Sequence, residues 1–126
     1  MKFTVLSLFP EILEGYFKAS IMAKAVERGL ITYELINIRD FAEDKHRTCD
    51  DAPYGGGAGM VLKPGPIAKA FDSLTNSSAR SIYLSASGKK LDSRLASELA
   101  EEEEIVFLCG RYEGIDQRAV ELYVNE

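Results

Sequence analysis

Residues 39–60 hold the side chains of this sequence that are best suited to chemistry. The segment reads RDFAEDKHRTCDDAPYGGGAGM and contains the only histidine of the chain, two adjacent aspartates and four glycines within residues 55–59. Histidine and carboxylates can transfer protons, and a cation can steady developing negative charge. Glycines lose much chain entropy on folding, so four of them close together indicate that bare backbone is needed there. We infer a ligand site and expect no core element in this segment.

Two shorter polar turns follow apolar runs further along the chain. Residues 85–88 read SASG after the run at 81–84, and residues 110–114 read GRYEG after the run at 105–109. In an open parallel sheet, ligands bind outside the carboxyl ends of the strands. We therefore expect these turns and the segment from residue 39 onward to line one crevice. The chain has no G-x-x-x-x-G-K-[ST] loop, and no G-x-G-x-x-G opens a helix after the first strand, so a standard phosphate-binding motif is not supported.

The elements that must position these turns alternate between strand and helix patterns. Strands are expected at residues 3–8, 30–38, 81–84 and 105–109, and helices at residues 11–29, 64–74 and after Asp92. Gly29 is expected to cap the first helix, and the helix that Asp92 caps is expected to bury Leu91, Leu95 and Leu99. The alternation predicts one α/β domain with a mainly parallel sheet and helices on both faces.

Composition and charge narrow the class of function. With 46% hydrophobic residues the chain is expected to fold, and its apolar runs are too short to cross a bilayer, so we expect a cytoplasmic protein without membrane contact. The net charge of −5 disfavours a nucleic-acid partner. The acids, however, gather at the chain's end and at residues 101–104, which we expect to form a solvated connector, while Arg39, Lys45, His46 and Arg47 lie near the glycines. A nucleic-acid partner therefore stays open.

The two cysteines show no pattern of a metal site or a disulfide. Cys49 lies in the polar segment and Cys109 ends an apolar run, and neither has a companion at zinc-ligand spacing. We expect two reduced thiols, with Cys109 as inert core, and no bound metal.

A set of short motifs occurs in one order along the whole chain. They are SLFP at residues 7–10, RDF at 39–41, HR at 46–47, DDAPYGGGAGM at 50–60, YLS at 83–85 and CGRYEGID at 109–116. Together they resemble the bacterial tRNA (guanine-N1)-methyltransferase family, TrmD. Each piece alone is a weak signal, but the glycine block and the CGRYEGID block together are very specific.

The resemblance implies a SPOUT-class α/β domain with a deep trefoil knot, in a homodimer whose subunits share the active site. It implies methyl transfer from S-adenosylmethionine to N1 of the guanosine that is 3′-adjacent to the tRNA anticodon. The expected cofactor-binding residues are Tyr83, Leu84, Ser85, Ala86, Gly88, Gly110, Arg111, Tyr112, Glu113 and Gly114. The expected tRNA-binding residues are Arg39, His46, Arg47, Asp50, Tyr54, Gly55, Gly56, Gly57 and Gly59. Within this second set, Arg47 and Asp50 are expected to be catalytic.

The resemblance also implies that residues 1–126 are the N-terminal portion of such an enzyme, forming its S-adenosylmethionine-binding domain. Family members continue through a glycine-containing knot loop, a linker and a helical C-terminal domain that carries the proposed general base. We therefore expect the knot to be incomplete in this chain, the main general base to lie beyond Glu126, and the chain alone to be inactive. A magnesium requirement is left open by the sequence.

The same residues also have plainer interpretations. His46 can be an ordinary loop histidine, Asp50 and Asp51 can be turn formers, and Arg111 with Glu113 can form a surface ion pair. The glycines can serve a close-packed turn. The alternative hypothesis is accordingly a non-catalytic α/β module that binds a nucleotide or RNA.

Overall fold

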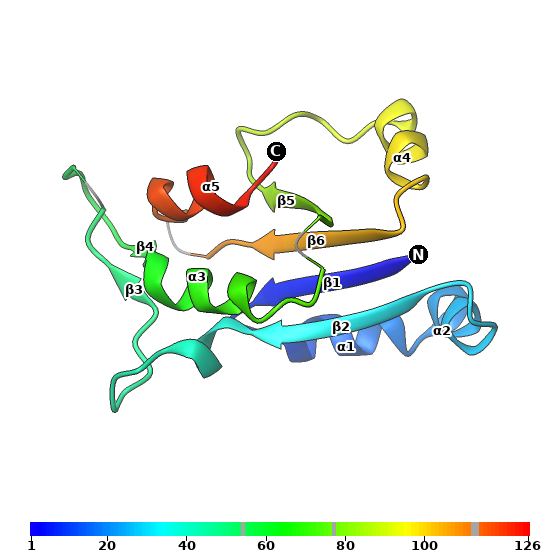
Figure 1. The fold of residues 1–126 in the computed structure, drawn as a ribbon, viewed down its shortest axis with the longest axis horizontal. Coiled ribbons are helices and arrows are strands. Elements are labelled where there is room, and N and C mark those ends of the chain that lie inside the picture. The colour runs from blue at the N-terminus through cyan, green and yellow to red at the C-terminus, as the bar shows by residue number, and fades with distance from the viewer. Residues whose placement is uncertain (54, 77, 112–113) are drawn as a thin grey trace.

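The computed structural model describes residues 1–126 except 54, 77 and 112–113. Its main sheet has four parallel strands in the order β2-β1-β6-β5 (Figure 1). The strands are β1 (Lys2–Ser7), β2 (Thr32–Asn37), β5 (Arg80–Leu84) and β6 (Glu104–Cys109). The helices are α1 (Pro10–Phe17), α2 (Ser20–Glu27), α3 (Pro64–Asp72), α4 (Ser93–Leu99) and α5 (Gln117–Tyr123). Because α1 and α2 lie on one face of the sheet and α3 and α5 on the other, the expected α/β class is confirmed (Figure 1).

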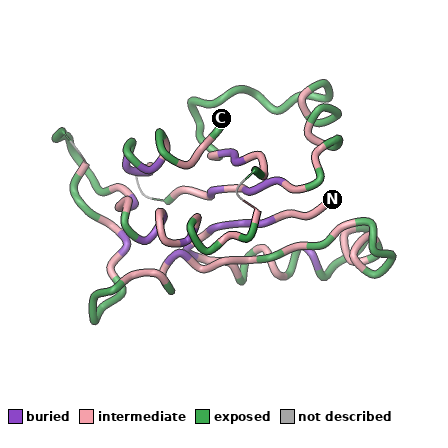
Figure 2. The backbone as a smooth tube through the Cα atoms, in the orientation of Figure 1, coloured by how far each residue is buried: buried purple, intermediate pink, exposed green. Residues whose placement is uncertain are grey.

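The main core lies between the sheet and the helices α3 and α5. Leu6 of β1 and Leu108 of β6 are register partners, and neither is exposed to solvent. They share one buried cluster with Ile67 and Ala70 of α3 and with Ala119 of α5 (Figure 2). Fully burying a leucine or isoleucine side chain contributes about 1.5–3 kcal/mol. This core therefore holds the carboxyl halves of the central strands in place.

The opposite face of the sheet is built from aromatic rings. Phe17 of α1 stacks on Tyr33 of β2 with ring centroids 4.3 Å apart, and Phe3 of β1 lies 6.2 Å from Phe107 of β6. Ring pairs of this kind add about 0.5–1.5 kcal/mol beyond the burial of their area. Neither α2 nor α4 contains a fully buried residue. This side of the sheet is therefore covered more thinly than the side under α3 and α5.

The single helix expected at residues 11–29 is wrong, because α1 and α2 are separate. The first helix ends at its cap Lys18, and Ser20 adopts a φ of +51°. Left-handed backbone is costly for a non-glycine residue and cannot belong to one continuous helix. The expected cap is confirmed: Gly29 has a φ of +72°, and its N–H donates to the carbonyl of Val26 at 3.0 Å.

The apolar stripe expected around α4 is only partly buried. Leu91 precedes the helix and is 65% exposed, whereas Leu95 and Leu99 are half-buried. The expected cap is confirmed, since the Asp92 carboxylate accepts a hydrogen bond from the backbone N–H of Leu95 at 2.8 Å. The spacing was thus correct for a helix, but no described element packs closely over Leu91.

Glu104, expected in a solvated connector, is instead the first residue of β6. Its carboxylate accepts hydrogen bonds from Asn76 Nδ2 at 3.0 Å and from Thr4 Oγ1 at 2.9 Å, and it pairs with Lys2 Nζ at 3.4 Å. Partial burial alone would raise the pKa of Glu104, but these partners together hold it below its ordinary value. The run of glutamates therefore ends inside the sheet.

Three elements around residues 39–60 and after residue 114 were not expected. They are a 3₁₀ helix (Ile38–Phe41), a two-stranded antiparallel sheet of β3 (Asp50–Asp51) and β4 (Val61–Leu62), and α5. The expectation that this polar segment avoids the core is also wrong at one residue, because Cys49 is 1% exposed and belongs to the main core cluster. Cysteine behaves as a small apolar residue when buried, so one position can anchor an otherwise polar loop.

Asp116 caps α5, and we expect Asp116→Ala to lower the free energy of unfolding by about 2 kcal/mol at pH 7. Its carboxylate is buried and accepts hydrogen bonds from Arg118 N and Nε, both at 2.9 Å, and from Arg118 Nη2 at 2.8 Å. Urea unfolding of the two proteins measures the difference. The control is Asp92→Ala, which removes the exposed cap of α4 and should cost about 1 kcal/mol.

The stabilisation by Asp116 should also depend on pH. Hydrogen bonds from the Arg118 side chain lower the pKa of Asp116 below the ordinary value of 3.8. A carboxyl group whose pKa is lower in the folded state stabilises the fold above its unfolded pKa and loses this effect as the pH falls through the folded pKa. The gap between wild type and Asp116→Ala should therefore narrow below pH 3.8. A gap that stayed constant down to about pH 2 would assign the effect to the cap rather than to the charge.

Candidate functional site

The ring of Tyr83 joins the two short turns at the carboxyl edge of the sheet. Tyr83 lies near the end of β5, and residues 110–114 follow β6 directly. A Cβ atom built on Gly110 would lie 3.2 Å from Tyr83 Cε2, and one built on Gly114 would lie 3.4 Å from the Tyr83 hydroxyl. The two glycines therefore leave the space that the tyrosine ring occupies. Gly114 also needs a positive φ, which is +136°.

The long segment is tied to the second of these turns by its backbone. The Leu62 N–H donates to the carbonyl of Gly114 at 3.0 Å, and the Leu62 carbonyl accepts from the Asp116 N–H at 2.9 Å. At the same end of the small sheet, next to Leu62, the Lys63 N–H donates to the carbonyl of Cys49 at 2.8 Å. The base of the 39–60 segment is thus tied to the turn at 110–114, which follows β6 at the carboxyl edge of the main sheet.

The first turn presents backbone and small side chains to solvent. Residues 84–88 are all exposed, and the Gly88 N–H closes the turn by donating to the carbonyl of Ser85 at 3.1 Å. A Cβ atom on Gly88 would lie 3.3 Å from that same carbonyl oxygen, so a larger residue would distort the turn. The expected residues Leu84, Ser85, Ala86 and Gly88 are therefore accessible to a ligand.

A hollow of about 470 Å³ lies beside this turn. Its walls are mostly apolar and include Tyr83, Leu84 and Gly88 from the candidate site and Leu95, Leu99 and Phe107 from α4 and β6. An apolar hollow with backbone polar groups at its rim suits a flat heterocycle. Gly110 and Gly114 do not line this hollow, so they lie near it only through the Tyr83 ring.

Arg111 connects the second turn to the end of β1. It is exposed, and its guanidinium carbon lies 4.9 Å from the ring centroid of Phe9. A cation over an aromatic face is worth about 0.5–1 kcal/mol at an exposed site. Tyr112 and Glu113, two further expected cofactor residues, lie outside the described residues, and so does the alternative ion pair of Arg111 with Glu113.

Arg39 and Asp40, at the start of the long segment, hold Arg47 in place. Arg39 Nη1 donates to the carbonyl of Arg47 at 3.0 Å, and Arg47 Nη1 pairs with Asp40 Oδ1 at 3.6 Å. Arg47 has a φ of +50°, a conformation that non-glycine residues rarely adopt and that is common at functional sites. The structure therefore brings together the expected residues Arg39 and Arg47.

The turn that carries His46 is closed by Asp44. The Asp44 carboxylate accepts hydrogen bonds from Thr48 Oγ1 at 2.6 Å and from the Thr48 N–H at 2.7 Å. The hydrogen bond from the Thr48 side chain is the main cause that lowers the pKa of Asp44. His46 and Lys45 are exposed on this turn. His46 is thus accessible to a partner molecule, and Asp44 is a positioning residue that the sequence analysis did not single out.

The two adjacent aspartates differ in their surroundings. Asp50 is half-buried and lies opposite Leu62 in the small sheet, immediately after the buried Cys49. Asp51 is exposed, and its carboxylate accepts from the Ala52 N–H at 2.8 Å. Neighbouring residues of a strand point to opposite sides. Only one of the two aspartates can therefore face the carboxyl edge of the main sheet, where the candidate site lies.

The glycine block forms the exposed tip of the hairpin between β3 and β4. Gly55, Gly56, Gly57 and Gly59 all have positive φ, at +84°, +97°, +113° and +87°. Cβ atoms built on the first three would meet no atom within 4 Å. The backbone conformation itself, rather than tight packing within the chain, therefore requires glycine here. The tip projects away from the main sheet and does not reach the turn at 85–88 (Figure 1). Tyr54 lies outside the described residues.

The described residues show both cysteines unpaired, Cys49 buried and Cys109 half-buried. Burial raises the pKa of each thiol.

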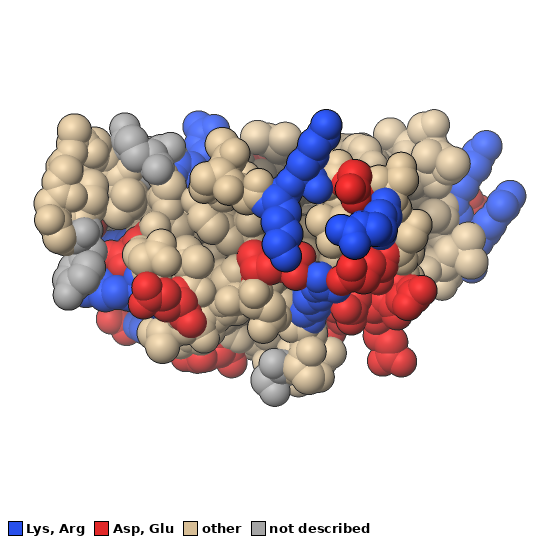
Figure 3. All heavy atoms as spheres, turned by 90° about the horizontal axis from the view of Figure 1, so that it is seen from above, with Lys and Arg blue, Asp and Glu red and all other residues tan. Residues whose placement is uncertain are grey.

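Within the described part of the chain, no three His, Cys, Asp or Glu side chains are grouped so as to hold a metal ion. None of the described helices is long and apolar enough to cross a membrane. On the surface seen from above, acidic and basic side chains lie side by side (Figure 3).

Comparison with known proteins identifies one family. A family model described as tRNA (Guanine-1)-methyltransferase TrmD matches residues 1–126. Curated proteins named tRNA (guanine-N(1)-)-methyltransferase from Treponema denticola and Carboxydothermus hydrogenoformans are 60% and 49% identical over 126 residues, all of this chain and 52% and 50% of theirs. The chain thus spans about half the length of the curated relatives it matches.

A solved structure supports the same assignment. The crystal structure of a tRNA methyltransferase from Aquifex aeolicus is 36% identical, has a TM-score of 0.88, and is matched over 100% of this chain and 57% of that chain. The expected α/β fold of the SPOUT type is therefore confirmed. Because the family model covers every residue, the chain belongs to the tRNA (guanine-1)-methyltransferase TrmD family.

Proposed function

We propose that residues 1–126 form the S-adenosylmethionine-binding domain of an enzyme that methylates N1 of the guanosine 3′-adjacent to the tRNA anticodon. The observation that carries the proposal is the contact of Tyr83 with the positions of Gly110 and Gly114, which unites the two turns expected to bind the cofactor. The family match over the whole chain supports it. The names of the relatives describe methylation of guanine N1 in tRNA.

The residues present fit the cofactor that this reaction needs. An adenine ring requires an apolar slot with backbone donors and acceptors, and the hollow beside residues 84–88 has this character. The turn at 110–114 would hold the remainder of the adenosyl group from the other side of Tyr83. When bound, S-adenosylmethionine supplies an electrophilic methyl group. The residues of this chain bind and orient the cofactor. Orientation alone can account for a large part of the acceleration of methyl transfer.

The guanosine is assigned to the segment that carries Arg47 and Asp50. Guanine N1 holds a proton near neutral pH, so that proton would pass to a base as N1 bonds to the methyl carbon, while the bond from that carbon to sulfur breaks and S-adenosylhomocysteine leaves. A cation beside O6 stabilises the charge that then develops, and Arg47 is the exposed cation held in a fixed conformation by its neighbours. The Asp50 carboxylate can accept hydrogen bonds from the N–H groups of the guanine edge.

A homodimer and a cytoplasmic tRNA substrate complete the proposal. The glycine tip at residues 55–59 stands away from the turn at residues 85–88 of its own chain, which is proposed to bind the cofactor (Figure 1). Such a placement suits a site that a second subunit completes. A bare, exposed backbone also allows close approach of an unstacked base, which enzymes that modify RNA bases require.

The test is methylation of a tRNA transcript by the complete protein, with S-adenosylmethionine carrying a labelled methyl group. Nuclease digestion should yield labelled 1-methylguanosine from the position next to the anticodon. A transcript with adenosine at that position is the control and should remain unlabelled. If the protein bound S-adenosylmethionine and tRNA but produced no 1-methylguanosine, the non-catalytic binding module would replace this proposal.

A further inference from the structure

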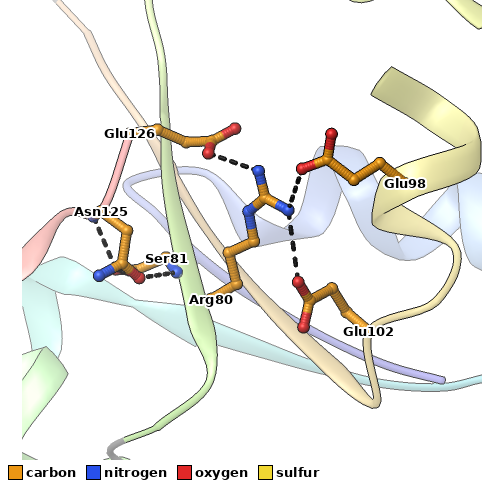
Figure 4. Close-up of polar contacts among 6 residues, drawn as sticks. All are labelled: Arg80, Ser81, Glu98, Glu102, Asn125 and Glu126. Atoms are coloured by element: carbon orange, nitrogen blue, oxygen red, sulfur yellow. Dashed lines mark hydrogen bonds and ion pairs between the residues drawn. The ribbon is translucent and has the colours of Figure 1, made fainter. Parts of the chain in front are cut away.

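Arg80 opens β5, and its guanidinium contacts three carboxylates from three separate segments (Figure 4). Nη1 pairs with Glu98 Oε1 at 2.8 Å and with Glu102 Oε1 at 3.3 Å, and Nη2 pairs with Glu126 Oε2 at 2.6 Å. The first of these acids belongs to α4, the second to the connection before β6, and the third follows α5. The Arg80 side chain is only 19% exposed, so solvent screens these contacts less than it screens an open surface pair.

The segment at residues 124–126 lies along the outer edge of β5. The Asn125 N–H donates to the carbonyl of Ser81 at 3.0 Å, and Asn125 Oδ1 accepts from the Ser81 N–H at 2.8 Å (Figure 4). Two residues further along the strand, the Tyr83 N–H donates to the carbonyl of Glu126 at 2.8 Å. This pairing sets the position of the segment relative to the strand.

The segment held in this way touches the candidate cofactor site. The amide that donates to Glu126 belongs to Tyr83, the residue whose ring occupies the space left by Gly110. Glu126 also lines the hollow beside the turn at 85–88. A shift of residues 124–126 would therefore change both the backbone of β5 near the turn and one wall of the hollow.

We propose that Arg80 is a positioning residue for the cofactor site, because it holds residues 124–126 against β5 and thereby fixes Tyr83 and the turn that follows. The inference rests on the proposed function for its effect on the cofactor. Three carboxylates converge on one cation, so without Arg80 they repel one another and the segment moves outward. An ion pair that served stability alone would leave cofactor affinity unchanged.

The experiment compares three substitutions in the complete protein: Arg80→Gln, Glu126→Gln and the matched control Glu98→Gln. Glu98 is bound to the same guanidinium but lies on α4, away from the edge of β5. Calorimetry measures the Kd for S-adenosylmethionine, and hydrogen exchange measures the protection of the Tyr83 amide. Arg80→Gln and Glu126→Gln should weaken binding by about tenfold and speed exchange at Tyr83, and Glu98→Gln should change Kd by less than about twofold.

Equal weakening by all three substitutions would overturn the proposal, as would Arg80→Gln with an unchanged Kd and unchanged exchange at Tyr83. Should Arg80→Gln fail to fold, Arg80→Lys gives the same comparison, because lysine keeps the charge but cannot bridge Glu98 and Glu126 with one planar fork. If the wild-type protein does not bind S-adenosylmethionine, the proposed function fails. Exchange at Tyr83 then decides the positioning role of Arg80 by itself.

Discussion

Replacing Gly110 by valine is expected to weaken S-adenosylmethionine binding by at least about 100-fold while the domain stays folded. A Cβ atom at this position would lie 3.2 Å from Tyr83 Cε2, 3.4 Å from the Tyr83 hydroxyl and 3.7 Å from Ile115 Cγ1. The valine methyl groups would add to this crowding, so the tyrosine ring has to move. Because Tyr83 leads into the turn at 85–88 and lines its hollow, both halves of the proposed site would be displaced. Calorimetry on the complete protein measures the change.

The matched control is Gly15→Val. A Cβ atom on Gly15 would meet no atom within 4 Å, so the same chemical change falls in open space on α1. This variant should bind the cofactor like the wild type, and circular dichroism should show both variants folded. An unchanged Kd for Gly110→Val would remove the turn at 110–114 from the cofactor site.

The second large effect is expected at Asp50. Asp50→Asn should lower the rate of tRNA methylation by about 100-fold and change the Kd for S-adenosylmethionine by less than about threefold. Asparagine keeps the size of the side chain, but it loses the charge and replaces one acceptor oxygen with a donor. Asp50 lies half-buried on the segment assigned to the guanosine, where an accepting carboxylate can meet ring N–H groups. Initial rates at saturating cofactor and calorimetry measure the two quantities separately.

The neighbouring residue provides the control for this prediction. Asp51 is exposed, and its carboxylate is engaged by the N–H of Ala52. Asp51→Asn should therefore change the methylation rate by less than about threefold, since the asparagine side-chain oxygen can accept the same hydrogen bond. If Asp50→Asn reduced the methylation rate and the cofactor affinity equally, Asp50 would belong to the cofactor site or to the folding of the hairpin.

The strands of the main sheet could be predicted because their signal is local. The four expected segments match β1, β2, β5 and β6 to within about two residues at each end, as is typical for short apolar runs bounded by turn residues. The Asp92 cap and the Gly29 cap were also predictable, since each depends on one residue type at one position. The left-handed backbone at Ser20 separates α1 from α2, but serine is not a residue type that predicts such a conformation.

Burial was predicted less well, because it depends on which element packs against a side chain. Leu91 fits an apolar stripe but remains exposed, while Cys49 lies in a polar run and is buried. Glu104 follows three other glutamates and is nevertheless held inside the sheet by Asn76 and Thr4. Each outcome is decided by a partner that lies far away in the sequence.

The sequence by itself determined the family, the positions of the four main strands along the chain, and the three segments that carry the candidate site, because those depend on motifs and local patterns. Only the tertiary structure decided how the segments meet. The pairing of Leu84 with Cys109 places the two short turns side by side, so that Tyr83 reaches the space left by Gly110. The three acids around Arg80 come from segments up to 46 positions away. Such contacts follow from strand register and packing, which the local pattern of a sequence does not encode.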